Sequence, residues 1–149
     1  MAAEERERAG KARPLGEYAG LAASFWALFA VFVAANRDRL PERIGLGDTL
    51  RITLATYKLA RLIAKDEVTS FVRAPVTEDE ETQEPAREGV RRALGELVTC
   101  PYCIGLWVAS GLSYAHVLAP RETRFATTIF SAHAVSDFLH AGFVRLRGG

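Results

Sequence analysis

The sequence has little net charge and few cysteines. Its 149 residues include 19 basic and 18 acidic side chains, for a formal net charge of +1, and only two cysteines. Two cysteines cannot form the disulfide framework of a small secreted domain. We find no internal repeat and no nucleic-acid-binding motif, so we expect no nucleic-acid partner. A mean hydropathy of +0.04 is what a soluble protein would show, but this average conceals how the charges are distributed.

Three long stretches of the chain contain almost no charge. Residues 18–35 and 97–120 carry none, and residues 125–144 carry only Asp137. A bilayer is crossed by a helix of about 20 mostly apolar residues. Buried helices of a soluble core normally show a polar stripe, which is missing here. We therefore predict an all-α membrane helix bundle, with spanning helices at about 18–35, 103–120 and 125–143.

The segments outside these helices are polar. Residues 1–17 mix acidic and basic side chains, unlike the basic leader of a signal peptide, so we expect an uncleaved first helix behind a polar tail. Residues 76–88 are acidic and contain Pro85, and we expect this loop to be mobile. We assign residues 18–147 to one membrane domain, in a multi-pass protein of the cell membrane.

A further helix is predicted at about 49–65, with Asp48 or Thr49 as its N-cap. It is amphipathic, and one face carries four basic side chains: Arg51, Lys58, Arg61 and Lys65. This face suits the anionic head groups of lipids. The helix either spans the bilayer or lies at its surface, because two basic residues near mid-bilayer roughly offset its leucines and isoleucines.

The placement of Lys and Arg predicts the orientation. If helix 49–65 spans, the side that holds the N-terminal tail, residues 65–102 and the C-terminus has 11 basic residues against 5. If it lies flat, the counts are 13 against 6. The more basic side is normally cytoplasmic. Both topologies therefore place Cys100, Cys103 and the C-terminus in the cytoplasm, and only the N-terminus changes side.

Three segments together resemble a known family. They are residues 54–75 (LATYKLARLIAKDEVTSFVRAP), residues 96–109 (ELVTCPYCIGLWVA) and the end of the last helix, residues 131–140. The combination is similar to a bacterial integral-membrane family known as domain of unknown function 1360, in which some members are labelled sporulation proteins. The resemblance implies a small multi-span bacterial membrane protein. It implies no activity.

The Cys-Pro-Tyr-Cys motif at Cys100–Cys103 also resembles a glutaredoxin active site. That fold needs strands around the motif, and no such pattern surrounds it here. Thiols at a helix N-terminus nevertheless have their thiolate form stabilised by the helix dipole. The alternative is two small side chains at a membrane interface, with Pro101 in the first helical turn.

The last helix carries His133, Asp137 and His140, spaced so that all three share one face. Ionisable groups inside a membrane are costly and usually have a partner. We predict that Asp137 pairs with Lys58 or Arg61 on helix 49–65. The alternative use of this face is as a transport pathway.

A metal site is a second possibility at the cysteines. If the last two helices are antiparallel, Cys103 lies opposite His140, with Asp137 less than a turn deeper. Two thiolates, an imidazole and a carboxylate suit tetrahedral zinc. The predicted ligands of this site are Cys100, Cys103, His140 and Asp137.

A polar pair lies between helix 49–65 and the acidic loop. Asp66 and Arg73, with Thr69 between them, could form an ion pair with a helix-end cap or contact lipid phosphate, and the sequence does not decide.

The favoured function is an accessory or interaction subunit of the membrane, or a sporulation-type membrane factor, rather than an enzyme. Its partners would be the bilayer, other membrane proteins or further copies of the chain. The alternatives are a membrane-face metal or thiol-redox site at Cys100, Cys103 and His140, and a subunit of an oligomeric small transporter.

Overall fold

The protein is built from helices, as predicted. The computed structural model describes residues 15–77 and 89–148, and the elements in these ranges are all helical. In chain order they are α2 (Leu15–Ala35), η1 (Arg37–Arg39), α3 (Leu46–Lys65), η2 (Glu67–Thr69), α4 (Ser70–Arg73), η3 (Ala74–Val76), α5 (Gly89–Thr99), α6 (Pro101–Leu118) and α7 (Pro120–Arg147). The predicted polar tail lies almost wholly, and the acidic loop largely, outside the described residues.

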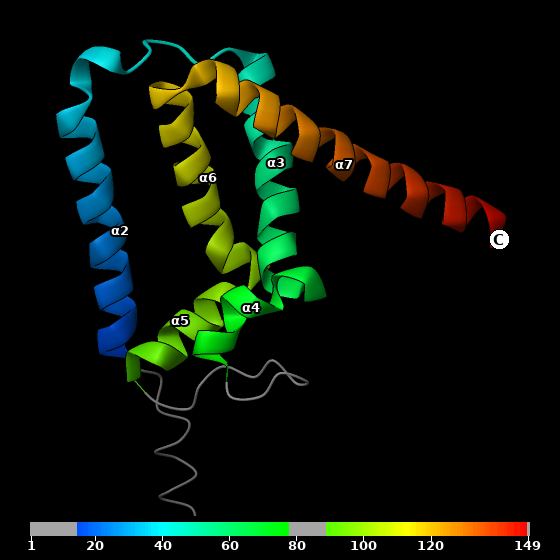
Figure 1. The fold of residues 1–149 in the computed structure, drawn as a ribbon, viewed down its shortest axis with the longest axis horizontal. Helices are drawn as coiled ribbons and strands as arrows, with labels where there is room; N and C mark the ends of the chain where they lie inside the picture. Colours follow the sequence, from blue (N-terminus) through cyan, green and yellow to red (C-terminus); the bar gives the residue numbers. More distant parts are fainter. Residues whose placement is uncertain (1–14, 78–88, 149) are drawn as a thin grey trace, which may run out of the picture.

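Three helices stand side by side and two shorter ones close one end (Figure 1). α2, α6 and α3 are upright in this view, with α4 and α5 lying across their lower end. α3 is the central element and makes the most extensive contacts, with α7 and α6. It approaches α6 closely because Gly105 has no side chain: a Cβ there would lie 4.0 Å from the Cβ of Ala60. Small residues of this kind let helices pack closely in lipid.

α2 is attached to the bundle mainly through aromatic rings. Phe25 meets Trp107 edge-to-face at 5.4 Å, and Phe32 stacks on Tyr114 at 4.1 Å between ring centroids. At its lower end the Tyr18 hydroxyl donates a hydrogen bond to Glu96 of α5. None of the residues of α2 is buried. Most of its apolar surface therefore faces outward.

The chain turns sharply between α5 and α6. The two helices are bent by 83° at Cys100, the residue that separates them. Pro101 is the first residue of α6, where its missing N–H would have had no helical partner in any case. The corner places the two cysteines where the upright helices meet the crosswise helix α5.

α7 runs in a different direction from the one predicted. We expected it to return antiparallel to α6, but it crosses α3 and extends away from the bundle (Figure 1). Ala119 alone separates α6 from α7, which is too short a connection for an antiparallel helix hairpin. The buried residues of α7 recur every three or four positions on the face toward α3: Thr123, Thr127, Ser131 and Ala134.

The prediction of three spanning helices is not confirmed. Among the described residues, α2 alone is a single helix long and apolar enough to cross a membrane, and α5 with α6 qualifies only as a bent pair. α7 does not qualify, although residues 125–144 carry only one charge. The threonine, serine and histidine side chains of α7 lower its hydropathy, although they add no charge at neutral pH.

Candidate functional site

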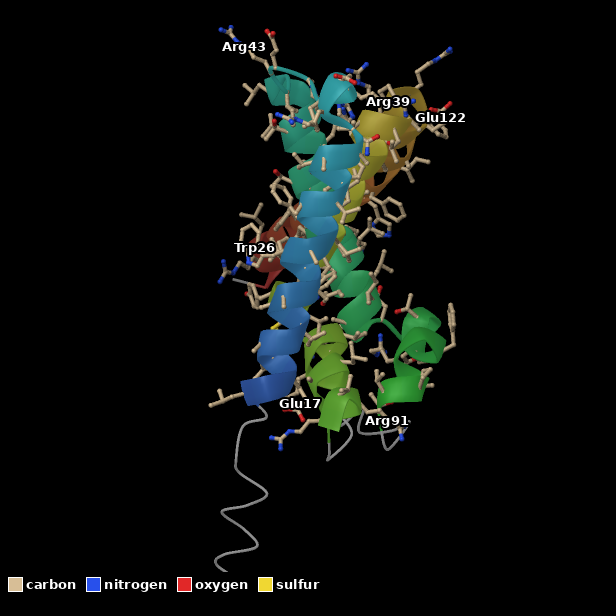
Figure 2. The ribbon with its side chains drawn as sticks, turned by 90° about the vertical axis from the view of Figure 1, so that its left-hand side faces the viewer. Glu17, Trp26, Arg39, Arg43, Arg91 and Glu122 are labelled. Atoms are coloured by element: carbon tan, nitrogen blue, oxygen red, sulfur yellow. The ribbon has the colours of Figure 1, made fainter. Side chains whose placement is uncertain are left out.

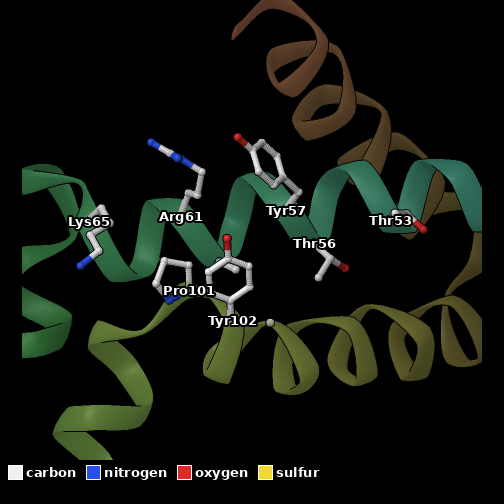
Figure 3. Close-up of a pocket in the computed structure, with 9 residues that line it drawn as sticks. Thr53, Thr56, Tyr57, Arg61, Lys65, Pro101 and Tyr102 are labelled. Atoms are coloured by element: carbon white, nitrogen blue, oxygen red, sulfur yellow. The ribbon is translucent and has the colours of Figure 1, made fainter. Parts of the chain in front are cut away.

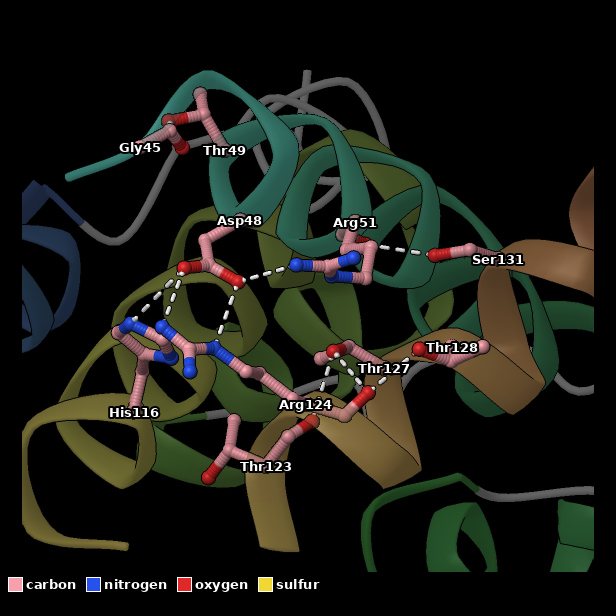
Figure 4. Close-up of polar contacts among 10 residues, drawn as sticks. All are labelled: Gly45, Asp48, Thr49, Arg51, His116, Thr123, Arg124, Thr127, Thr128 and Ser131. Carbon is pink, nitrogen blue, oxygen red and sulfur yellow. Dashed lines mark hydrogen bonds and ion pairs between the residues drawn. The ribbon is translucent and has the colours of Figure 1, made fainter. Parts of the chain in front are cut away.

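An acidic residue at the start of α3 holds three elements together (Figure 4). The Asp48 carboxylate accepts hydrogen bonds from Arg124 Nε at 3.0 Å and from Arg124 Nη2 at 2.9 Å. Arg51 Nη2 donates to the same carboxylate at 2.7 Å, and His116 Nε2 lies 3.8 Å away. These partners come from α7, α3 and α6 respectively. We call this group, Asp48, Arg51, His116 and Arg124, the Asp48 cluster.

The sequence analysis suggested Asp48 only as an N-cap and did not predict that it would bond to other helices. α3 begins earlier, with Gly45 as its N-cap, so Asp48 lies within the first turn and faces inward. Hydrogen bonds from Arg124 and then from Arg51 hold the pKa of Asp48 well below its usual range. The i, i+3 spacing of Asp48 and Arg51 could have indicated their pairing. The distant partner, Arg124, has no such signal.

We expect the Asp48 cluster to make stability depend on pH. A carboxyl group whose pKa is lowered by folding stabilises the protein above its unfolded pKa of about 3.9 and loses this effect as the pH falls. Asp48→Asn should therefore lower the melting temperature at pH 7, and its difference from the wild type should shrink below about pH 4. Thermal unfolding in detergent from pH 3 to pH 7 tests this. A difference that is constant over this range would contradict it, and Asp38→Asn on η1 is the control.

A second ion pair joins the middle of α3 to α7. Lys58 Nζ donates to Asp137 Oδ2 at 2.7 Å, and His133 Nδ1 lies 3.4 Å from Asp137 Oδ1. Lys58 is only 8% exposed, so its ammonium charge is poorly hydrated. The Asp137 carboxylate compensates this charge. Lys58 is one of the two partners that the sequence suggested for Asp137. The other, Arg61, instead lies over the Tyr57 ring, 5.9 Å from its centroid.

The two cysteines form a thiol pair at the α5–α6 corner. Both are free, with the Cys103 thiol donating to Cys100 Sγ at 2.7 Å. Cys100 is also the N-cap of α6, and the backbone N–H of Cys103 donates to its sulfur at 3.3 Å. Hydrogen bonding from the Cys103 thiol, partly opposed by burial, lowers the pKa of Cys100. Burial raises the pKa of Cys103, so Cys100 is the more readily ionised of the two thiols.

Comparison with known proteins agrees with the resemblance seen in the sequence. The family model described as "Protein of unknown function (DUF1360)" matches residues 51–143, more than half of the chain. The chain belongs to this family. The DUF1360 region runs from the first turns of α3 to near the end of α7. It contains the Lys58–Asp137 pair and the thiol pair, and it leaves out α2 and Asp48.

Two curated relatives from Bacillus subtilis (strain 168) match the chain at about one quarter sequence identity. The chain is 27% identical over 98 residues to "Sporulation protein YjcA", covering 59% of this chain and 83% of that protein. It is 25% identical over 85 residues to "UPF0713 protein YngL", covering 54% of this chain and 65% of that protein, just under two thirds of its length. No solved structure matches the chain significantly.

The predicted zinc site is not assembled in the described part of the DUF1360 region. Within residues 15–77 and 89–148, no group of three or more histidine, cysteine, aspartate or glutamate side chains could hold a metal ion. The prediction joined Cys100 and Cys103 to His140 and Asp137 by assuming an antiparallel α7. α7 instead carries Asp137 to Lys58 of α3 and leaves His140 exposed.

Arg73 has a structural role that the sequence left open. It is 1% exposed, and its guanidinium donates to the carbonyl oxygens of Ile63 and Asp66 and to Thr69 Oγ1. The carbonyls of a last helical turn have no partner within the helix. Arg73 therefore caps the end of α3 and complements its dipole. Arg73 binds the backbone carbonyl of Asp66. Of the roles that the sequence left open, the structure therefore forms the helix-end cap.

Proposed function

We propose that this DUF1360 protein is a small multi-pass membrane protein with an accessory or interaction role. The observation that carries the proposal is the surface of α2. This helix has no buried residue, and large apolar side chains stand out from it, with Trp26 63% and Val31 66% exposed. An exposed apolar face of this extent is unfavourable in water and marks a membrane or protein contact. In lipid the same face is solvated.

The distribution of charge along the bundle supports this proposal. Figure 2 shows Arg39, Arg43 and Glu122 at one end and Glu17 and Arg91 at the other. Trp26 lies between these ends and points outward. Charged residues at both ends with an exposed tryptophan between them suit a bilayer, in which the Lys58–Asp137 pair at the middle of α3 would have its charges compensated.

The helix directions favour α3 as a spanning element. α2 and α6 run from the end that holds α5 toward the opposite end, and α3 runs back (Figure 1). In this topology the thiol corner shares a side with the beginning of α2. Residues 1–17 and 65–102 together hold nine basic residues, against five in residues 36–50 and 119–124. By the positive-inside rule, the corner faces the cytoplasm.

The use of the polar groups supports an accessory role over catalysis. Asp48, Lys58, Asp137 and Arg73 each bond to a neighbouring helix or helix end. Such contacts fix the packing of helices. One relative carries the name sporulation protein. We therefore extend the proposal to a membrane factor of sporulation.

We predict that the protein stays in the membrane fraction at alkaline pH and that its thiols face the cytoplasm. Cys100 and Cys103 should react with an impermeant maleimide only after the cells are permeabilised. A single added cysteine at Arg43→Cys, in a Cys100→Ser/Cys103→Ser background, should react in intact cells, because that loop lies at the opposite end. Release by alkaline carbonate would contradict the membrane proposal, and labelling of Cys100 and Cys103 in intact cells would contradict the orientation.

The accessory role has a separate test. Native electrophoresis of a mild detergent extract should show the chain in a complex larger than a 16.3 kDa monomer in its micelle. A monomer alone would contradict an interaction role and leave the membrane location standing.

A further inference from the structure

A groove runs along the bundle between α3 and α6. Its volume is about 560 Å³. The groove follows α3 from Thr53 to Lys65, and α7 borders it at Tyr57, whose ring stacks on that of Phe138 at 5.2 Å between centroids. Figure 3 shows Lys65 and Arg61 at one end of the groove, Tyr57 at its middle and Thr53 at the other end, with Tyr102 facing α3 from α6. Ala60 and Gly105, which form its floor, carry no polar side chain.

The charge of this groove is of one sign. Arg61 and Lys65 line it, and none of its lining residues is acidic. The other two basic residues predicted on this face are already engaged, Arg51 with Asp48 and Lys58 with Asp137. Among the described residues, no ion pair joins Arg61 or Lys65 to a carboxylate. The cationic end of the groove therefore suits an anionic ligand.

The size of the groove matches half of a bilayer. Lys65 follows Thr53 by twelve residues, so the groove extends roughly 18 Å at about 1.5 Å per residue. One leaflet of the hydrocarbon core is about 15 Å thick. The cationic end is next to Pro101 and the thiol corner, at the end that we assign to the cytoplasm. Anionic lipids in the cytoplasmic leaflet attract basic side chains close to the membrane surface.

We propose that this groove binds one anionic phospholipid of the cytoplasmic leaflet. Its phosphate would lie between Arg61 and Lys65, and one acyl chain would follow α3 past Tyr57 and Ala60. Arg61 supplies the planar donor group that bonds phosphate oxygens in pairs, and Lys65 adds a point charge. Tyr102 is 94% exposed at the mouth and can reach the interfacial region, where tyrosine is favoured. This site rests on the membrane location proposed above.

The test compares lipids on the purified full-length protein in an uncharged detergent. Dioleoylphosphatidylglycerol should raise the melting temperature by several degrees more than dioleoylphosphatidylcholine at equal concentration. Arg61→Gln/Lys65→Gln should lose this difference, and Arg61→Lys/Lys65→Arg should keep most of it. Arg37→Gln/Arg39→Gln removes the same charge at the opposite end of the bundle and should leave the difference unchanged.

Further arms identify the occupant. Inorganic phosphate alone should not reproduce the stabilisation, because the acyl chain contributes to binding; equal stabilisation by phosphate would overturn the lipid as the ligand. Equal effects of both lipids on the wild type, or a preference that survives in Arg61→Gln/Lys65→Gln, would overturn the site. A stabilisation that follows protein concentration instead of lipid would assign the groove to a second copy and also overturn it.

Failure of this site can be told apart from failure of the membrane proposal. The Arg61→Gln/Lys65→Gln variant should remain in the membrane after alkaline carbonate extraction, because α2 carries the exposed apolar surface. A wild-type protein that stays in the membrane without preferring the anionic lipid contradicts the groove alone. A wild-type protein that carbonate releases contradicts the membrane location first.

Discussion

Arg73→Met should lower the free energy of unfolding by about 2–4 kcal/mol. The guanidinium of Arg73 is buried and donates to two backbone carbonyls at the end of α3 and to the Thr69 hydroxyl. Methionine keeps most of the side-chain volume but leaves these carbonyls, in a part-buried site, without their donors. Each unsatisfied buried polar group costs about 1–3 kcal/mol. Equilibrium unfolding in detergent, followed by the fluorescence of Trp26 and Trp107, measures the loss.

Arg91→Met is the matched control for this prediction. Arg91 also donates to a backbone carbonyl, that of Pro75, from Nε at 3.2 Å and from Nη2 at 2.9 Å, but it is exposed. Water can replace it, so its loss should cost less than about 1 kcal/mol. Arg73→Lys should be intermediate, because one ammonium group cannot reproduce the planar donor set. Equal losses in Arg73→Met and Arg91→Met would show that burial of the cap contributes nothing.

Asp137→Asn should destabilise the protein more than Asp137→Asn combined with Lys58→Met. Lys58 is buried and its ammonium group depends on the Asp137 carboxylate 2.7 Å away. Removing the carboxylate charge alone leaves a buried cation without its counter-ion, which is more costly than removing both charges. We expect a fall of several degrees in melting temperature, of which the double variant recovers roughly half or more.

A variant of Arg61 serves as the control that distinguishes the loss of the Lys58–Asp137 pair from the loss of a positive charge in general. Arg61 lies on the same helix, and in the described structure its guanidinium contacts the Tyr57 ring rather than the Asp137 carboxylate. Arg61→Met combined with Asp137→Asn should therefore show effects that nearly add, measured by thermal unfolding without anionic lipid. Additive effects for Lys58→Met and Asp137→Asn would mean that the ion pair contributes no coupling energy.

The local features of this protein were predictable because their causes lie within a few residues. The uncharged run of α2 predicted a helix that could cross a membrane. The proline after Cys100 favoured a helix beginning at the thiol pair. The desolvation cost of one acidic residue in an otherwise uncharged run indicated that Asp137 needs a basic partner, and the structure joins it to Lys58. The resemblance to the DUF1360 family is confirmed by the family match.

The sequence alone thus determined the helical class, the resemblance to the family and the need of Asp137 for a basic partner. Only the tertiary structure decided which distant groups meet. The direction of α7 depends on a single connecting residue and on the packing of small side chains against α3, and the spacing of these side chains along the chain does not say which helix they will meet. That direction brings Arg124 to Asp48 and Asp137 to Lys58, and among the described residues it does not join His140 to the cysteines in a metal site. Charge and periodicity act along the chain, whereas the angle between helices is set by packing across it.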